Sequence, residues 1–304
     1  MHVASSDNNR RIAAAALVMS ALSIATSSVL VRRAYDFGSS PETVVVMRVA
    51  VPALAFGLWM TVAAMRSRSL PRLSKDALVF AALYGLVLLV INLFELKALD
   101  RIPVALVILI IALVPLWISI ASWLLWRVPL GRRGALAMVI ALGGTALIVG
   151  SPSGRVDGLG LVFSLATSVL SAGLYLLLER RLSEPPPQLV IAVGAVVATV
   201  AAVAAEPHAL AEELGSGGHR AGLVIGAGLG LSLTMLLSMI GIRRSSAFVA
   251  GVAVTCEPIF AGLLAWLVLD ETLTALQLAG GAVALLGLGL ALTAPTSRGA
   301  PVGV

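Results

Sequence analysis

Charged residues are scarce in this chain. Asp, Glu, Lys and Arg make up only 12% of its 304 residues, whereas soluble globular domains average about 25% charged residues. Hydrophobic residues, by contrast, make up 59% of the chain. This composition excludes an ordinary soluble domain and indicates a membrane protein.

Cysteine and histidine are also scarce. The single cysteine, Cys256, lies inside an apolar run, so a disulfide framework within the chain is excluded. The three histidines, His2, His208 and His219, fall in the amino-terminal tail and in one loop. They form neither a metal-ligand cluster nor a Ser-His-Asp or Cys-His arrangement. We therefore predict no enzyme activity, no metal site and no cofactor.

Ten apolar runs follow one another along the chain. Each has roughly 20 residues, which is the length a helix needs to cross about 30 Å of hydrocarbon. We therefore predict an all-α membrane protein with ten transmembrane helices. The first run is too long for the apolar region of a signal peptide, about 7 to 15 residues, and we expect it to remain as a helix. The predicted spans are residues 12–31, 41–64, 76–96, 102–126, 134–150, 158–179, 188–205, 220–241, 247–269 and 274–294.

The Lys and Arg residues predict how these spans are oriented. Fourteen of them lie on the side that would hold both termini, six lie on the other side, and Arg48 alone lies within a span. Because Lys and Arg are enriched in cytoplasmic loops, we predict that both termini are cytoplasmic. The net charge of +6 then reflects membrane topology, and we expect no nucleic-acid partner.

The chain contains an internal repeat with an offset of 143 residues. Residues 113–130 align without a gap with residues 256–273. Pro and Trp matches carry more weight than aliphatic ones, because chance identity is high in sequence rich in Ala and Leu. The matched pairs include Pro115 with Pro258, Trp123 with Trp266 and Leu130 with Leu273.

A second match, SIATS at 23–27 with SLATS at 164–168, lies earlier in each copy. Each copy holds five spans, and because five is odd the two copies must cross the membrane in opposite senses. We therefore predict two inverted five-helix repeats, residues 1–150 and 151–304, around a central cavity.

These features resemble the EamA-type members of the drug/metabolite transporter superfamily. The resemblance covers residues 12–294 and is most specific in EPIFAGLLAWLVLDETLTALQLAGGAVALLGLGL, which begins at Glu257, and in Arg48 of the second span. The first repeat departs from the family pattern, with Arg127 and Val128 where the second has Asp270 and Glu271. This departure favours a topological role for the acidic pair.

The resemblance implies secondary transport of small organic molecules through a central cavity, commonly export of amino acids, other metabolites or toxic compounds from bacteria. It implies a small-molecule substrate, a place in the bacterial inner membrane, and protons as a candidate coupling ion. An uncoupled facilitator, exchanger or importer is an alternative within transport. A non-transporting membrane scaffold or sensor is an alternative from another class. Oligomeric state stays open, and a monomer fits the sequence.

Three prolines lie in the interior of predicted spans, away from the span ends. Proline removes the helix hydrogen bond to the carbonyl four residues back, so we expect kinks at Pro52, Pro115 and Pro258. Matched breaks in corresponding helices of two repeats indicate a binding site, although prolines also shape helix packing. The freed carbonyls belong to Arg48, Ile111 and Val254.

Polar residues follow helical spacing on three spans and are candidates to line the cavity or to bind neighbouring helices. On the third span, Glu95 is also at a depth where it could pair with Arg48. The candidates are Ser20, Ser23 and Ser27 on the first span, Tyr84, Asn92 and Glu95 on the third, and Ser164, Ser168, Ser171 and Tyr175 on the sixth.

Glu257 lies near the centre of the ninth predicted span, directly before Pro258. A charged carboxylate at that depth costs at least about 2.5 to 3.5 kcal/mol, so it should be paired, protonated or exposed to a cavity. Three roles remain open: a proton-coupling site, a ligand for an amine or cation on the substrate, and a structural acceptor beside the proline break.

Overall fold

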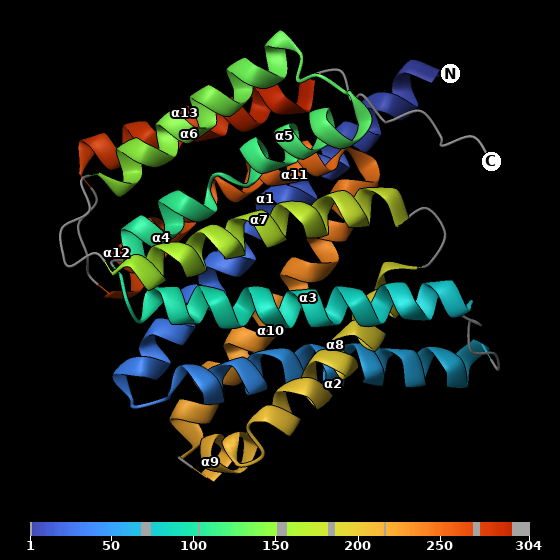
Figure 1. The fold of residues 1–304 in the computed structure, drawn as a ribbon, viewed down its shortest axis with the longest axis vertical. Coiled ribbons are helices and arrows are strands. Elements are labelled where there is room, and N and C mark those ends of the chain that lie inside the picture. Colours follow the sequence, from blue (N-terminus) through green and yellow to red (C-terminus); the bar gives the residue numbers. More distant parts are fainter. Residues whose placement is uncertain are drawn as a thin grey trace.

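The computed structural model describes residues 2–67, 74–102, 104–150, 157–181, 186–215, 217–269 and 274–293. Their secondary structure consists of thirteen helices (Figure 1). The helices are α1 (His2–Asp36), α2 (Pro41–Ser67), α3 (Lys75–Leu99), α4 (Val104–Ile111), α5 (Val114–Trp126), α6 (Arg132–Val149), α7 (Gly158–Arg181), α8 (Pro187–Ala205), α9 (Ala209–Gly215), α10 (Gly218–Arg244), α11 (Ala247–Val254), α12 (Glu257–Leu269) and α13 (Ala275–Thr293).

Ten stretches of helix in the described residues are long and apolar enough to cross a membrane. They coincide with the ten predicted spans, so the all-α, multi-pass fold is confirmed. The first span extends past residue 31 to Asp36, because the helix continues until the turn in which Gly38 adopts a φ of +90°. The short helix α9, between the seventh and eighth spans, was not predicted.

The two five-helix repeats pack on each other in a symmetric pattern. Helix α7 is the counterpart of α1, and α10 is the counterpart of α3. Helix α1 packs on α10, and α7 correspondingly packs on α3. Two further pairs join a helix to its own counterpart: α2 with α8 and α6 with α13. The fourth and ninth spans, which are also counterparts, meet through α5 and α11. Inverted repeats related by an axis in the membrane plane produce this pattern.

Helices α6 and α13, which lie side by side in Figure 1, show this symmetry at the level of single residues. A Cβ atom added to Gly144 would lie 2.6 Å from the carbonyl oxygen of Gly280. One added to its repeat equivalent, Gly287, would lie 2.6 Å from the amide nitrogen of Ala141. Larger residues at either glycine would therefore separate the two backbones, which explains the small residues found here.

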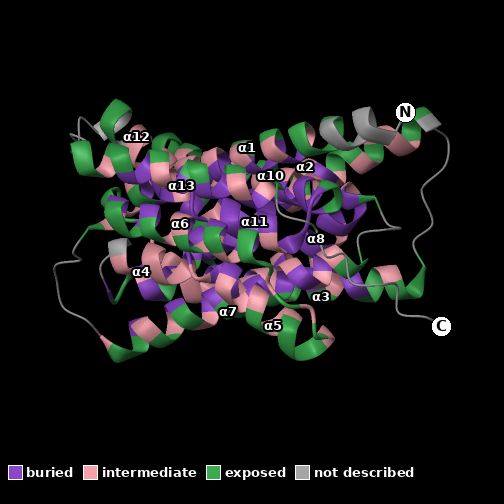
Figure 2. Cartoon of the chain, turned by 90° about the horizontal axis from the view of Figure 1, so that it is seen from above, coloured by how far each residue is buried: buried purple, intermediate pink, exposed green. Residues whose placement is uncertain are grey.

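The buried residues gather in the centre of the bundle and the exposed ones lie around it and at its ends (Figure 2). Large apolar side chains such as Leu54 and Leu286 are exposed, as expected where a helix faces lipid. The repeat-matched Trp123 and Trp266 are similarly exposed, at 51% and 52%. Both tryptophans therefore lie on the outer surface of the bundle, in agreement with a role as interface anchors.

The fourth and ninth spans are broken helices. The first break separates α4 from α5 just before Pro115, and the second separates α11 from α12 just before Pro258. The two breaks fall at equivalent positions of the repeats. Helix α2, by contrast, continues through Pro52. Of the three spans with an interior proline, two are therefore broken.

Some residues used to predict orientation and loop charge lie outside the described residues. They are Arg68, Arg72, Arg155, Asp270, Glu271 and Arg298.

Candidate functional site

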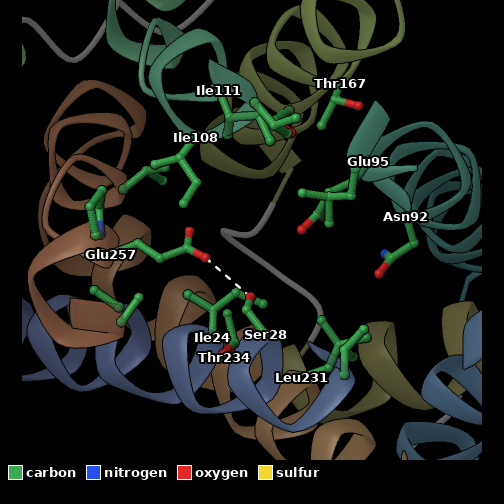
Figure 3. A pocket seen from close by; sticks show the side chains of 18 of the residues that line it. Ile24, Ser28, Asn92, Glu95, Ile108, Ile111, Thr167, Leu231, Thr234 and Glu257 are labelled. Carbon is green, nitrogen blue, oxygen red and sulfur yellow. Dashed lines mark hydrogen bonds between the residues drawn. The ribbon is translucent and has the colours of Figure 1, made fainter. Parts of the chain in front are cut away.

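A cavity of about 910 Å³ lies between the two repeats. Its lining comes from both repeats, including α1, α2 and α3 of the first and α7, α10 and α12 of the second. Figure 3 shows the polar side chains Ser28, Glu95 and Glu257 arranged around this space, together with apolar side chains such as Ile108 and Leu231. A mostly apolar cavity with a few polar groups is typical of small-molecule sites.

The cavity reaches the surface at one end of the bundle. Arg32, Asp36 and Asp100, at the carboxyl ends of α1 and α3, line it and are exposed. At the other end its lining includes Leu17 and Leu174, which are buried in the largest apolar core cluster. The cavity is therefore accessible from the side of the membrane where α1 ends and is closed toward the side where α1 begins.

Glu257 is placed in the cavity by the break in the ninth span. It is the first residue of α12, and its side chain lines the cavity. The hydroxyl of Ser28 on α1 donates a hydrogen bond to Glu257 Oε1 at 3.4 Å, the dashed line in Figure 3. The amino terminus of a helix favours a negative charge, because its first amides lack partners within the helix. The break therefore provides a polar environment for a carboxylate within the bundle.

Neighbouring helices satisfy carbonyl groups at both breaks. Ser168 Oγ donates a hydrogen bond at 3.3 Å to the carbonyl of Ile111, the group that Pro115 frees. Thr145 Oγ1 donates at 3.1 Å to the carbonyl of Thr255 in the second break. Ser168 does not line the cavity, so its observed role is to support the break.

Two predicted serines on α1 also bind a neighbouring helix. Ser23 Oγ donates to the Gly230 carbonyl and Ser27 Oγ donates to the Ala227 carbonyl, each at 2.8 Å. Both acceptors belong to α10. Neither serine lines the cavity, because its hydroxyl is directed into the contact between α1 and α10.

The remaining candidates divide between core and cavity. Ser164 is buried and Tyr84 belongs to the apolar core, and neither lines the cavity. Ser171 and Tyr175, from the same predicted face of α7 as Ser164, do line it. The helical spacing of that face was correct, but the cavity extends along only part of it.

Arg48, Asn92 and Glu95 all line the cavity. Arg48 is only 1% exposed, and the structure shows no ion pair between it and Glu95 among the residues it describes. Asn92 Nδ2 donates to the Leu88 carbonyl at 2.8 Å on its own helix. The expected pairing of Arg48 with Glu95 is therefore absent, although both residues face the same space.

Several cavity residues were not predicted from the sequence, among them Ser28, Tyr35, Thr167 and Thr234. On α1, helical spacing could have identified Ser28 and Tyr35, because they and the predicted Ser20 lie about two turns apart on one face. The face chosen from the sequence contained Ser27, which lies about 100° around the helix from Ser28. Within the described residues, no three His, Cys, Asp or Glu side chains form a group that could hold a metal ion.

Comparison with known proteins supports the architecture described above. The EamA-like transporter family matches residues 11–150 and again residues 158–293. A solved structure titled "Crystal structure of protein" is similar with a TM-score of 0.69 and 20% sequence identity, over 91% of this chain and 96% of its own. At that identity the likeness shows the fold alone. Comparison with curated proteins gives no match. The two family matches cover both repeats, and the chain belongs to the EamA-like transporter family.

Proposed function

We propose that this protein is a secondary transporter that exports small organic metabolites, such as amino acids or related compounds or toxic compounds, across the bacterial inner membrane. Membership of a transporter family supports the general activity. The observation that carries the proposal for this chain is the cavity between the repeats, which contains the Glu257 carboxylate at a helix break.

The cavity suggests how transport proceeds. With both termini in the cytoplasm, as the positively charged loops favour, the exposed mouth at Arg32 and Asp100 faces the outside. The structure then corresponds to an outward-open state. Rocking of the repeats, residues 1–150 against 151–304, would close this mouth and separate Leu17 from its neighbours at the opposite end.

We further propose that a proton gradient drives export and that Glu257 alternates between protonated and ionised forms. Its carboxyl group lines the cavity, receives a hydrogen bond from Ser28 and begins a helix. A group in this position can exchange a proton with the cavity and can interact with a substrate amine.

The test is transport by the purified protein in lipid vesicles. Amino acids and cationic drugs are screened for movement with and without an imposed pH gradient, and the hits are repeated with Glu257→Gln. We expect the gradient to drive accumulation by the wild type and the variant to lose both accumulation and its pH dependence.

The outcomes separate the alternatives. A Glu257→Gln protein that still accumulates substrate with unchanged pH dependence would exclude the coupling role. Gradient-independent movement by the wild type identifies a facilitator or exchanger, and net inward accumulation identifies an importer. Absence of transport for every compound favours a scaffold or sensor. The polar cavity within the membrane argues against that class, because a scaffold has no need for one.

A further inference from the structure

The guanidinium group of Arg48 is buried at the wall of the cavity. Arg48 is 1% exposed, and its Nε and Nη2 atoms have no hydrogen-bond partner among the residues that the structure describes. Arginine stays protonated and has five N–H donors, so a buried guanidinium is costly unless acceptors face it. Because Arg48 lines the cavity, a molecule in the cavity can supply these acceptors.

Tyr35 brings a second unpartnered polar group to the same region. Its hydroxyl oxygen is buried and has no hydrogen-bond partner in the described part of the chain. Tyr35 lies on α1, Arg48 lies on α2, and both line the cavity. A guanidinium can only donate and a phenol can also donate, so a group that binds both must be an acceptor.

A carboxylate fits these donors. Its two oxygens match the planar fork of a guanidinium, and hydrogen bonds between such charged groups are shorter and stronger than neutral ones. A third acceptor position on the carboxylate remains available for the tyrosine hydroxyl.

The charges elsewhere in the cavity restrict what else the molecule carries. Arg48 and Arg32 are outnumbered by four acidic side chains that line the same space. A molecule with only a negative charge would be repelled by these acids, and one with only a positive charge would leave Arg48 unpaired. The acidic side chains are Asp36, Glu95, Asp100 and Glu257.

We propose that Arg48 and Tyr35 form a carboxylate subsite and that the transported molecules are zwitterions, with their amine facing Glu257 and Glu95. Glu257 and Glu95 lie on opposite sides of the space in Figure 3, so the amine has carboxylates on both walls. This inference rests on the proposed transport function, because it assigns the class of substrate that the cavity accepts.

Binding to the purified wild-type protein tests the charge preference without any mutation. Two sets of probes are used, and the members of each set differ only in their charged groups. The first set is leucine, leucinamide and 4-methylpentanoate. The second set is 6-aminohexanoate, hexylamine and hexanoate. The second set holds its amine and carboxylate further apart than the first. We expect the zwitterion of at least one set to bind about 10- to 100-fold more tightly than its single-charge analogues, as expected for losing a hydrogen bond to a charged group.

Variants then assign the carboxylate to its subsite. Arg48→Gln and Tyr35→Phe should weaken binding of the zwitterion, by about 10- to 100-fold and by a smaller factor respectively, and leave binding of the amine-only analogue nearly unchanged. Lys97→Gln is the control, because Lys97 is exposed on α3 and does not line the cavity. Tyr35→Phe removes only a hydroxyl, so it stays informative if Arg48→Gln fails to fold.

The inference is wrong if the amine-only analogues bind as tightly as the zwitterions, if no zwitterion binds, or if Tyr35→Phe and a folded Arg48→Gln leave the preference intact. These binding results are independent of movement across the membrane. A zwitterion preference without transport in vesicles would overturn the proposed function and leave the subsite standing, whereas transport without the preference would overturn the subsite alone.

Discussion

The two repeats contain equivalent helix breaks with different chemistry. In the first repeat the helix resumes at Val114, which is fully buried and packs against Ile118 in an apolar cluster. In the second it resumes at Glu257, whose carboxyl group receives a hydrogen bond from Ser28. Both residues line the cavity. The break therefore belongs to the ancestral five-helix unit, and the charge belongs to one copy only.

This difference separates what builds the fold from what acts in the cavity. A break present in both copies is explained by proline and by hydrogen bonds from neighbouring helices, Ser168 at the first break and Thr145 at the second. A carboxylate present in one copy is not needed to form the break, because Val114 occupies the equivalent position. We therefore expect changes at Glu257 to affect transport more than stability, and changes at the break supports to do the reverse.

The largest expected effect comes from making the second break like the first. Glu257→Val should reduce transport in vesicles by about 100-fold, because it removes a charged group that accepts hydrogen bonds in the cavity. The thermal stability of the protein in detergent should stay close to that of the wild type, since valine is accommodated at the equivalent position. Val114→Ile is the matched control and should retain transport. Unchanged transport by Glu257→Val would remove the distinction between the repeats.

An intermediate effect is expected from the prolines. Pro115→Ala and Pro258→Ala each restore an N–H group that can bond to the freed carbonyl four residues back. Such a bond is worth about 1 kcal/mol, which corresponds to roughly a fivefold shift toward a straight helix. Transport rates measured in parallel should fall by similar factors in the two variants. A loss in only one of them would show that the breaks are not equivalent hinges.

The smallest effects are expected from the side chains that support the breaks. Thr145→Val and Ser168→Ala should each lower the free energy of unfolding by about 0.5 to 1.5 kcal/mol. Thr145→Val should cost more, because its hydrogen bond is shorter at 3.1 Å against 3.3 Å. Unfolding in detergent measures both, with Thr61→Val as an exposed control whose hydroxyl donates to the Gly57 carbonyl of its own helix. Equal losses at all three sites would contradict the assigned support role.

The elements of this fold were predictable because their signals are local. The length of an apolar run sets a transmembrane span, and proline excludes one defined backbone hydrogen bond. The breaks before Pro115 and Pro258 followed from these rules. At Pro52 the helix α2 continues without a break. Helix α9 was missed because its seven residues are too short to give an apolar run.

The candidate site was less predictable because it depends on which face of each helix meets the cavity. Ser27 and Ser28 are adjacent in sequence, yet Ser27 binds α10 and Ser28 reaches Glu257. Spacing alone gives several polar faces and does not say which one packs on a neighbour. The charged residues Arg48, Glu95 and Glu257 all line the cavity, because a bundle in lipid has few other places for them.

The most direct test of the central claim is the accessibility of adjacent cysteines to a membrane-impermeant thiol reagent. The buried Cys256 is first replaced by alanine, and Ser27→Cys, Ser28→Cys and Glu257→Cys are then made singly. We predict that positions 28 and 257 react from outside the cell and that position 27 does not, because its side chain is buried against α10. Protection of both 28 and 257 from either side of the membrane, or equal reaction at 27 and 28, would contradict a water-accessible cavity at Glu257.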